Sequence, residues 1–166
     1  MFYFNYPDQD RYQEAQWIDD EEQWDMGVWM SDRGDDTLLE EDLLKALTGE
    51  AQAYYFYDRL AEMAPTEEEQ AIIYGIQEDE AKHFNWFSIM LERSGGEIPQ
   101  IPVGELPKDY KEGVKKAFHD ELEANEFYLD TAFQATVPYV ERNFLYASQD
   151  EQRHATQLQH ILMNMK

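Results

Sequence analysis

Apolar residues recur at helical spacing from Thr37 onward, and this pattern predicts a first helix. Thr37 and Glu40 form a capping box at its start, and Pro65 ends it because proline cannot continue a helix. Spacings of three and four residues place one set of side chains on the same helix face. That face carries Leu39, Leu43, Leu47, Glu50, Tyr54, Tyr57, Leu60 and Ala64.

A second helix is expected directly after Pro65. Thr66 and Glu69 form another capping box, and the Ser-Gly-Gly sequence at residues 94–96 ends the helix after Arg93. Because the turn between the two helices is short, we expect them to be antiparallel neighbours.

Residues 97–108 contain three prolines and a glycine and cannot continue a helix. A third helix is expected from Lys108 or Asp109 to about Ala135. Thr136 is the expected cap of a fourth helix, with Pro138 in its first turn. The fold class predicted for residues 37–166 is therefore all-α, an antiparallel four-helix bundle with one long crossover between helices two and three.

Residues 1–36 differ from the rest, because acidic residues dominate and Trp17, Trp24 and Trp29 are interleaved with them. No sustained helical stripe is present. Two interpretations remain open: a poorly ordered acidic tail, or an arm whose tryptophans dock on the bundle or on a partner subunit.

A short motif, Asp-Glu-x-[Lys/Arg]-His, occurs twice, at residues 79–83 and 150–154. Residues three apart are neighbours on a helix surface, so Glu80 lies beside His83. Glu151 and His154 are related in the same way. One such pair in an acid-rich chain can arise by chance, but two copies indicate a common site.

Both copies fall on apolar helix stripes rather than on charged faces. Glu80 and His83 continue the stripe of Ile73 and Ile76, and the second copy continues that of Phe144. Burying a carboxylate costs several kcal/mol unless a cation or hydrogen bonds offset its lost hydration, on the order given for buried ions. The pattern therefore predicts a bound cation.

The other two helices should supply further carboxylates. Glu50 lies on the first stripe, 30 residues before Glu80. In helix three the apolar stripe selects Glu126, whereas alignment of the two halves of the chain selects Glu123, 28 residues before Glu151. Both remain candidate ligands. The chain is then a duplicated helical hairpin around a pseudo-twofold axis.

Net charge and composition limit the function classes. A formal charge of -23 disfavours nucleic acid and anionic membrane surfaces as partners and attracts cations. The chain has no cysteine, which excludes zinc-thiolate sites, iron-sulfur clusters and redox thiols from it. The first residues do not resemble a signal peptide, and no apolar run is long enough to span a bilayer. We expect a soluble cytoplasmic protein.

Carboxylates with two imidazoles and no thiolate suit iron or manganese, and zinc could occupy the same site. Four glutamates bring about four negative charges, which two divalent ions would neutralise. Two neighbouring ions can bind dioxygen or peroxide between them. The sequence contains no nucleophile motif and no glycine-rich phosphate loop that would indicate another catalytic class.

This set of residues resembles the ferritin-like superfamily, and the rubrerythrin group most closely. The similarity covers residues 37–166 and implies a di-iron centre. Its ligands by resemblance are Glu50, which follows Gly49, then Glu80 with His83, Glu123 with Glu126, and Glu151 with His154.

The resemblance also implies residues around the ligands. Asp79 and Asp150 resemble aspartates that hydrogen-bond metal-bound histidines in di-iron oxidases such as the ribonucleotide reductase small subunit. Solvated helix carboxylates are the competing interpretation. Tyr57 resembles a tyrosine that orients a ligand carboxylate, and a packing tyrosine is its alternative.

The expected function is a di-iron oxidoreductase that uses dioxygen or hydrogen peroxide in oxidative-stress chemistry, as a ferroxidase or as a peroxidase. Rubrerythrins carry a cysteine-ligated iron domain that this cysteine-free chain lacks, so peroxide reduction requires an external electron donor. A manganese catalase-like enzyme and a non-catalytic metal-binding bundle are the alternatives. Bundles of this type often pair along helix faces, and a homodimer is expected.

Overall fold

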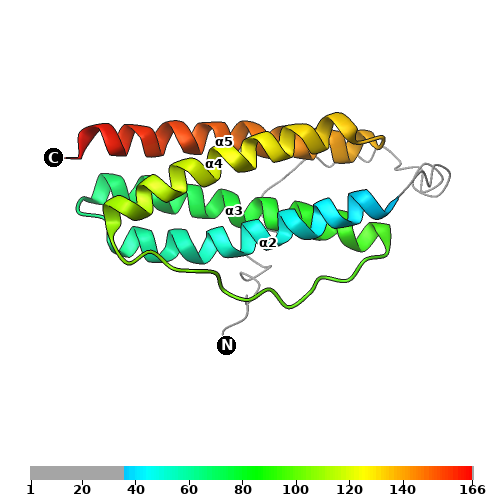
Figure 1. The fold of residues 1–166 in the computed structure, drawn as a ribbon, viewed down its shortest axis with the longest axis horizontal. Coiled ribbons are helices and arrows are strands. Elements are labelled where there is room, and N and C mark those ends of the chain that lie inside the picture. The colour runs from blue at the N-terminus through cyan, green and yellow to red at the C-terminus, as the bar shows by residue number, and fades with distance from the viewer. Residues whose placement is uncertain (1–35, 166) are drawn as a thin grey trace.

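The computed structural model describes residues 36–165, which form four helices and no strand. They are α2 (Asp36–Glu62), α3 (Glu67–Ser94), α4 (Tyr110–Gln134) and α5 (Pro138–Asn164). The all-α four-helix bundle predicted from the sequence is thereby confirmed (Figure 1). The expected N-terminal arm lies outside the described residues, apart from Asp36, where α2 begins.

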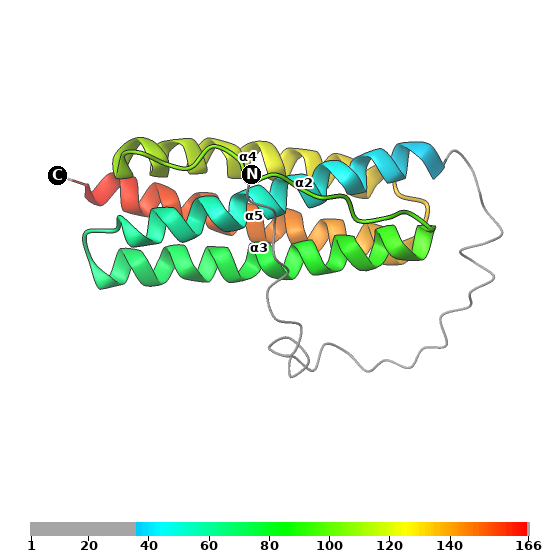
Figure 2. The ribbon, with the colours of Figure 1, turned by 90° about the horizontal axis from the view of Figure 1, so that it is seen from below.

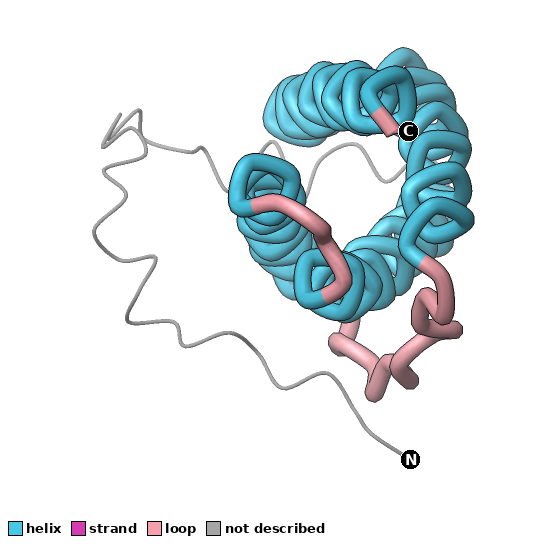
Figure 3. The backbone as a smooth tube through the Cα atoms, turned by 90° about the vertical axis from the view of Figure 1, so that its left-hand side faces the viewer, coloured by secondary structure: helices cyan, strands magenta, loops and turns pink. Residues whose placement is uncertain are grey.

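The helices form two antiparallel hairpins, α2 with α3 and α4 with α5, as the short turns predict. The segment between α3 and α4 has no helix and runs back along the length of the bundle (Figures 1 and 2). It is the expected long crossover. Seen from one end, the four helices surround a common axis (Figure 3).

Helix ends follow their local sequence in most places. The Thr66 hydroxyl accepts a hydrogen bond from the Glu69 backbone N–H at 3.2 Å, and Asp109 caps α4 in the same way. Gly95 ends α3 in the left-handed conformation with φ 90°, which glycine adopts without steric cost. The cap expected at Thr37 depends on a side chain outside the described ones.

Thr136 is not the cap of α5, contrary to the sequence prediction. The capping position is Val137, which makes no side-chain capping hydrogen bond, and Pro138 is the first helical residue. A proline disfavours helical geometry at the residue before it, so Val137 stays extended and Thr136 lies one position too early to cap.

These two threonines give a matched test of capping. Thr66→Ala should lower the free energy of unfolding by about 1 kcal/mol, because the Glu69 N–H loses its acceptor. Thr136→Ala should change the free energy of unfolding by about 0.5 kcal/mol or less, as ordinary surface substitutions do. Urea denaturation of the metal-free protein measures both, and equal losses would contradict the assignment of the caps.

The apolar core is divided along the bundle. One buried cluster includes Leu47, Phe87 and Phe144, and a second includes Leu60 and Ile73. Between the two clusters the inward positions are polar, with Glu50, Glu80, His83, Glu121, Glu151 and His154 all buried. Among residues 36–165, none of the helices has the length and apolar character needed to cross a lipid bilayer.

Candidate metal centre

Six buried side chains at the middle of the bundle form two groups of possible metal ligands. The first group is Glu50, Glu80, His83 and Glu151, and the second is Glu80, Glu121, Glu151 and His154. Within each group the candidate ligand atoms all lie within 4.8 Å of one another. Glu80 and Glu151 belong to both groups, so the two groups form one continuous cluster.

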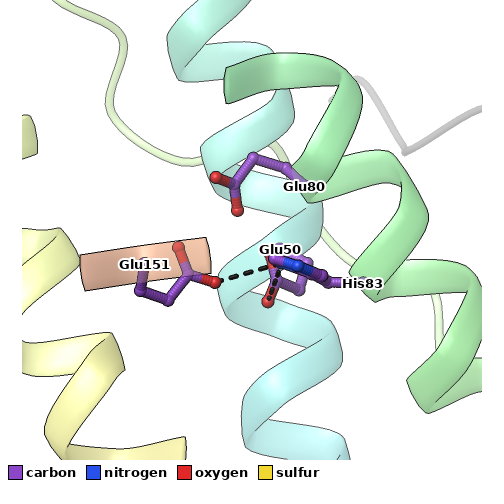
Figure 4. Close-up of side chains that lie close together, drawn as sticks. All are labelled: Glu50, Glu80, His83 and Glu151. Atoms are coloured by element: carbon purple, nitrogen blue, oxygen red, sulfur yellow. Dashed lines mark ion pairs between the residues drawn. The ribbon is translucent and has the colours of Figure 1, made fainter. Parts of the chain in front are cut away.

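Helical spacing positions these side chains as the sequence predicted. Glu80 and His83 are one turn apart on α3, and Glu151 and His154 are one turn apart on α5. Glu50 joins them from α2. Figure 4 shows Glu50, Glu80, His83 and Glu151 pointing toward one another from three helices.

In each histidine, Nδ1 faces the glutamates. The Nδ1 of His83 lies 3.1 Å from Glu151 Oε1 and 3.6 Å from Glu50 Oε1 (Figure 4). The Nδ1 of His154 lies 3.0 Å from Glu151 Oε2, 3.3 Å from Glu80 Oε1 and 3.4 Å from Glu121 Oε2. His83 thus directs one nitrogen at two carboxylates, and His154 directs one at three.

The other nitrogen of each histidine contacts an aspartate from the opposite hairpin. His83 Nε2 lies 3.1 Å from Asp150, and His154 Nε2 lies 3.2 Å from Asp79. An aspartate that accepts the Nε2 proton leaves the Nδ1 lone pair directed at the cluster. Of the two interpretations of the aspartates, the structure therefore supports histidine partners over solvated carboxylates.

Two cations close this side of the cluster. Lys82 Nζ lies 2.5 Å from Asp79 and 2.9 Å from Asp150, and Arg153 contacts the same two aspartates at 2.5 and 2.8 Å. Burial raises the pKa of Asp79 and Asp150. Hydrogen bonds from the histidines and Lys82, and their charges, together lower it by more, so both pKa values lie below normal. Both aspartates remain charged acceptors for the histidines.

Two tyrosines connect α2 and α4 through Glu50 and Glu121, the outer glutamates, each of which belongs to only one ligand group. Tyr57 on α2 donates a hydrogen bond to Glu121 on α4, and Tyr128 on α4 donates one to Glu50 on α2. Both hydroxyls are buried with their acceptors. Tyr57 therefore orients a cluster carboxylate, and that carboxylate belongs to α4 rather than to its own helix. Tyr128 makes the equivalent contact in the other direction, and it was not among the residues predicted from the sequence.

Burial and the close approach of charged neighbours shift the pKa values of three cluster glutamates. Burial raises the pKa of Glu80, and the nearby carboxylates of Glu151 and Glu50 raise it further. Burial also raises the pKa of Glu121. For Glu151 burial acts in the same direction, but the charge of His83 and the hydrogen bonds with Glu121, His154 and His83 together outweigh burial and lower the pKa. A cation would relieve this like-charge repulsion.

Three inward-facing atoms make no hydrogen bond: Glu80 Oε1, Glu151 Oε1 and His83 Nδ1. The short distance between His83 Nδ1 and Glu151 Oε1 lacks hydrogen-bond geometry. Buried polar atoms are normally paired, and the place of a bound ion is one reason for an exception. The cluster could therefore hold a metal ion, and its oxygen and imidazole nitrogen donors fit one.

Neither ligand predicted on helix three belongs to the cluster. Glu123 and Glu126 are exposed, and the α4 ligand position is taken by Glu121, which is 4 % exposed. The predicted stripe was misleading because two of its large apolar residues are exposed. Leu122 is 37 % and Phe133 is 76 % exposed.

A repeat in the sequence could have identified Glu121. Glu121 precedes Glu151 by 30 residues, the same spacing as Glu50 to Glu80. Every site residue in the first half of the chain then has a counterpart 71 positions later in the second half. The pairs are Glu50 and Glu121, Tyr57 and Tyr128, Asp79 and Asp150, Glu80 and Glu151, Lys82 and Arg153, His83 and His154.

A protein from Bacillus subtilis (strain 168) matches this chain, whereas no family model does. It is the uncharacterized protein YhjR, 34% identical over 130 residues, which are 78% of this chain and 90% of YhjR. The chain belongs to the YhjR family. All six cluster residues of this chain lie in its four helices.

A solved structure is also similar to this chain. A hypothetical protein from Pyrococcus furiosus superposes with a TM-score of 0.63 at 26% sequence identity. The match covers 75% of this chain and 88% of the other. Neither relative's name carries an activity, so the function has to be argued from the site.

Proposed function

We propose that this protein is a di-iron carboxylate oxidoreductase that reacts with dioxygen or hydrogen peroxide. The observation that carries the proposal is the pair of four-residue donor groups that share Glu80 and Glu151. Two sets of donors with two common carboxylates suit two adjacent ions. Glu50 and His83 would complete one position, and Glu121 and His154 the other.

Charge and donor type support two divalent ions of a first-row metal. Four glutamates bring about four negative charges to the cluster, which two divalent ions neutralise. Carboxylate and imidazole donors without thiolate suit iron, manganese or zinc. When bound, a pair of iron ions supplies the electrons that reduce dioxygen or peroxide.

The chain's own residues hold this site in place. Asp79 and Asp150 fix the tautomer and orientation of the two histidines, and Tyr57 and Tyr128 hold the outer glutamates. Because these partners are buried or paired with cations, the donors stay in position before a metal arrives.

The proposal extends the resemblance to the ferritin-like superfamily and its rubrerythrin group. A chain without cysteine cannot supply electrons from a cysteine-ligated iron domain of its own. Peroxide reduction therefore requires an external donor, whereas oxidation of Fe(II) requires none.

Anaerobic titration with Fe(II), followed by air or hydrogen peroxide, tests this function. We expect about two irons per chain, as two donor groups imply. A near-ultraviolet band from oxidised iron should then grow with the oxidant. Uptake of less than one metal per chain, or tightly held zinc with no spectral change after iron exchange, would overturn the proposal. Metal analysis of the protein purified without added metal separates iron from manganese.

A further inference from the structure

A cavity of about 540 Å³ lies between α2 and α4 and reaches the metal cluster. Its walls come from α2, α4 and the crossover segment around Gly104. The four glutamates Glu50, Glu80, Glu121 and Glu151 also line it, whereas the two histidines do not. The cluster is thus open toward α2 and α4, on the side away from Lys82 and Arg153.

Small side chains explain why this space is not filled. Ala46, Gly49 and Ala53 line it from α2, and Ala117 and Ala124 line it from α4. A methyl group built at Gly49 would meet no atom within 4 Å. The space is therefore large enough to admit an additional side chain, or a ligand.

The inner end of the cavity carries unsatisfied polar atoms. Glu80 Oε1 and Glu151 Oε1 are buried and make no hydrogen bond, and both residues belong to the lining. These are also the two glutamates shared by both ligand groups. A molecule in the cavity therefore lies directly beside the metal centre.

The volume exceeds what the oxidant needs. A water-sized molecule takes up about 30 Å³, and dioxygen and hydrogen peroxide are only slightly larger. Pockets for organic ligands typically have volumes of about 300–1,000 Å³, and the cavity falls in this range. Its size points to an organic occupant.

The wall chemistry selects the kind of molecule. Phe56 and Phe127 provide aromatic surface along with the alanines. Both lysines of the lining are already engaged: Lys45 Nζ lies 3.6 Å from the Phe127 ring centroid, and Lys116 is ion-paired with Asp120. With four glutamates at the inner end, an anion finds no free cation among the lining residues that the structure describes, and an apolar molecule finds contact surface.

We propose that this cavity binds a neutral, apolar organic molecule beside the metal centre. The inference rests on the proposed function, because it makes that molecule the organic substrate class of the same site. It requires neither lysine to leave its present contact. It also assigns a role to Gly49, whose missing side chain leaves the space open.

Binding of toluene tests the proposal, with benzoate as the anionic probe of similar size. The zinc-loaded full-length protein should bind toluene, as measured by saturation-transfer NMR and calorimetry, and should bind it more tightly than benzoate. Gly49→Leu should weaken toluene binding about tenfold or more, because Gly49 lines the cavity and a leucine side chain there takes up space that toluene would fill. Its metal content should match that of the wild type.

Gly75→Leu is the matched control, since Gly75 is also helical, exposed and open around its Cβ position, but does not line the cavity. It should bind toluene as the wild type does. Absence of toluene binding, tighter binding of benzoate, or equal binding by both leucine variants would overturn the inference. Toluene binding is also measured on metal-free protein. A chain that binds toluene but takes up no iron overturns the proposed function and leaves the cavity assignment standing.

Discussion

Glu121→Ala should reduce the bound metal from two ions per chain to one or none, while Glu123→Ala should leave both in place. Glu121 is buried, lies 3.4 Å from His154 Nδ1 and is the α4 residue of the ligand groups. Its loss removes a carboxylate from one group and leaves the Tyr57 hydroxyl without its acceptor. Mutation of a residue that only hydrogen-bonds a metal ligand typically lowers metal affinity about 10–100-fold, and loss of a direct ligand should lower it more.

Metal content after iron or zinc loading, measured by inductively coupled plasma mass spectrometry, checks this expectation. Glu126→Ala serves as a second control, because Glu126 is exposed on the same helix. If Glu123→Ala lost metal and Glu121→Ala retained it, the assignment of the α4 ligand would be wrong.

Glu80→Gln should make the metal-free protein more stable and at the same time remove most of the stabilisation by metal. Burial and neighbouring carboxylates raise the pKa of Glu80, so its charged form is disfavoured in the folded state. Glutamine keeps the size of the side chain without that charge. The free energy of unfolding should rise by on the order of 1 kcal/mol at neutral pH.

The sign of the pH dependence follows from the raised pKa of Glu80. A group with a raised folded-state pKa favours folding at pH values below its unfolded pKa, and this contribution is lost as the pH rises through the folded value. The stability advantage of Glu80→Gln over the wild type should therefore grow as the pH increases from the ordinary glutamate range to neutrality.

Thermal unfolding with and without zinc, at several pH values, measures both effects. Glu78→Gln is the matched control, since Glu78 is exposed on the same helix two residues earlier. It should change neither the metal-free stability nor the gain on metal addition. A Glu80→Gln protein that is less stable without metal, yet still stabilised by zinc as the wild type is, would contradict the ligand role of Glu80.

Periodicity was sufficient to predict the fold and most residues of the buried carboxylate and histidine cluster. On α2, α3 and α5, large apolar residues mark the inward face, so Glu50, Glu80 and Glu151 stand out as carboxylates on that face. Both histidines follow from their spacing. Local chemistry also gave the start of α3, because the Thr66 cap depends only on neighbouring residues.

The same reasoning failed on α4 for a physical reason. Part of its inward face borders the cavity and is built from Ala117, Glu121 and Ala124, whereas Leu122 and Phe133 point outward. A method that locates the core by large apolar residues selects the wrong face there. The hydrogen bonds between His83 and Asp150 and between Tyr128 and Glu50 join distant segments, so no local pattern identifies which residues are partners.

The shared glutamates have a consequence for assembly of the chain. The α2–α3 hairpin holds three residues of the first ligand group, and the fourth, Glu151, comes from α5; the α4–α5 hairpin likewise obtains Glu80 from α3. A hairpin folded by itself has an incomplete ligand group. Docking of the hairpins therefore also completes the candidate ligand groups. If the cluster binds metal as proposed, metal uptake distinguishes a docked bundle from a chain whose helices have formed separately.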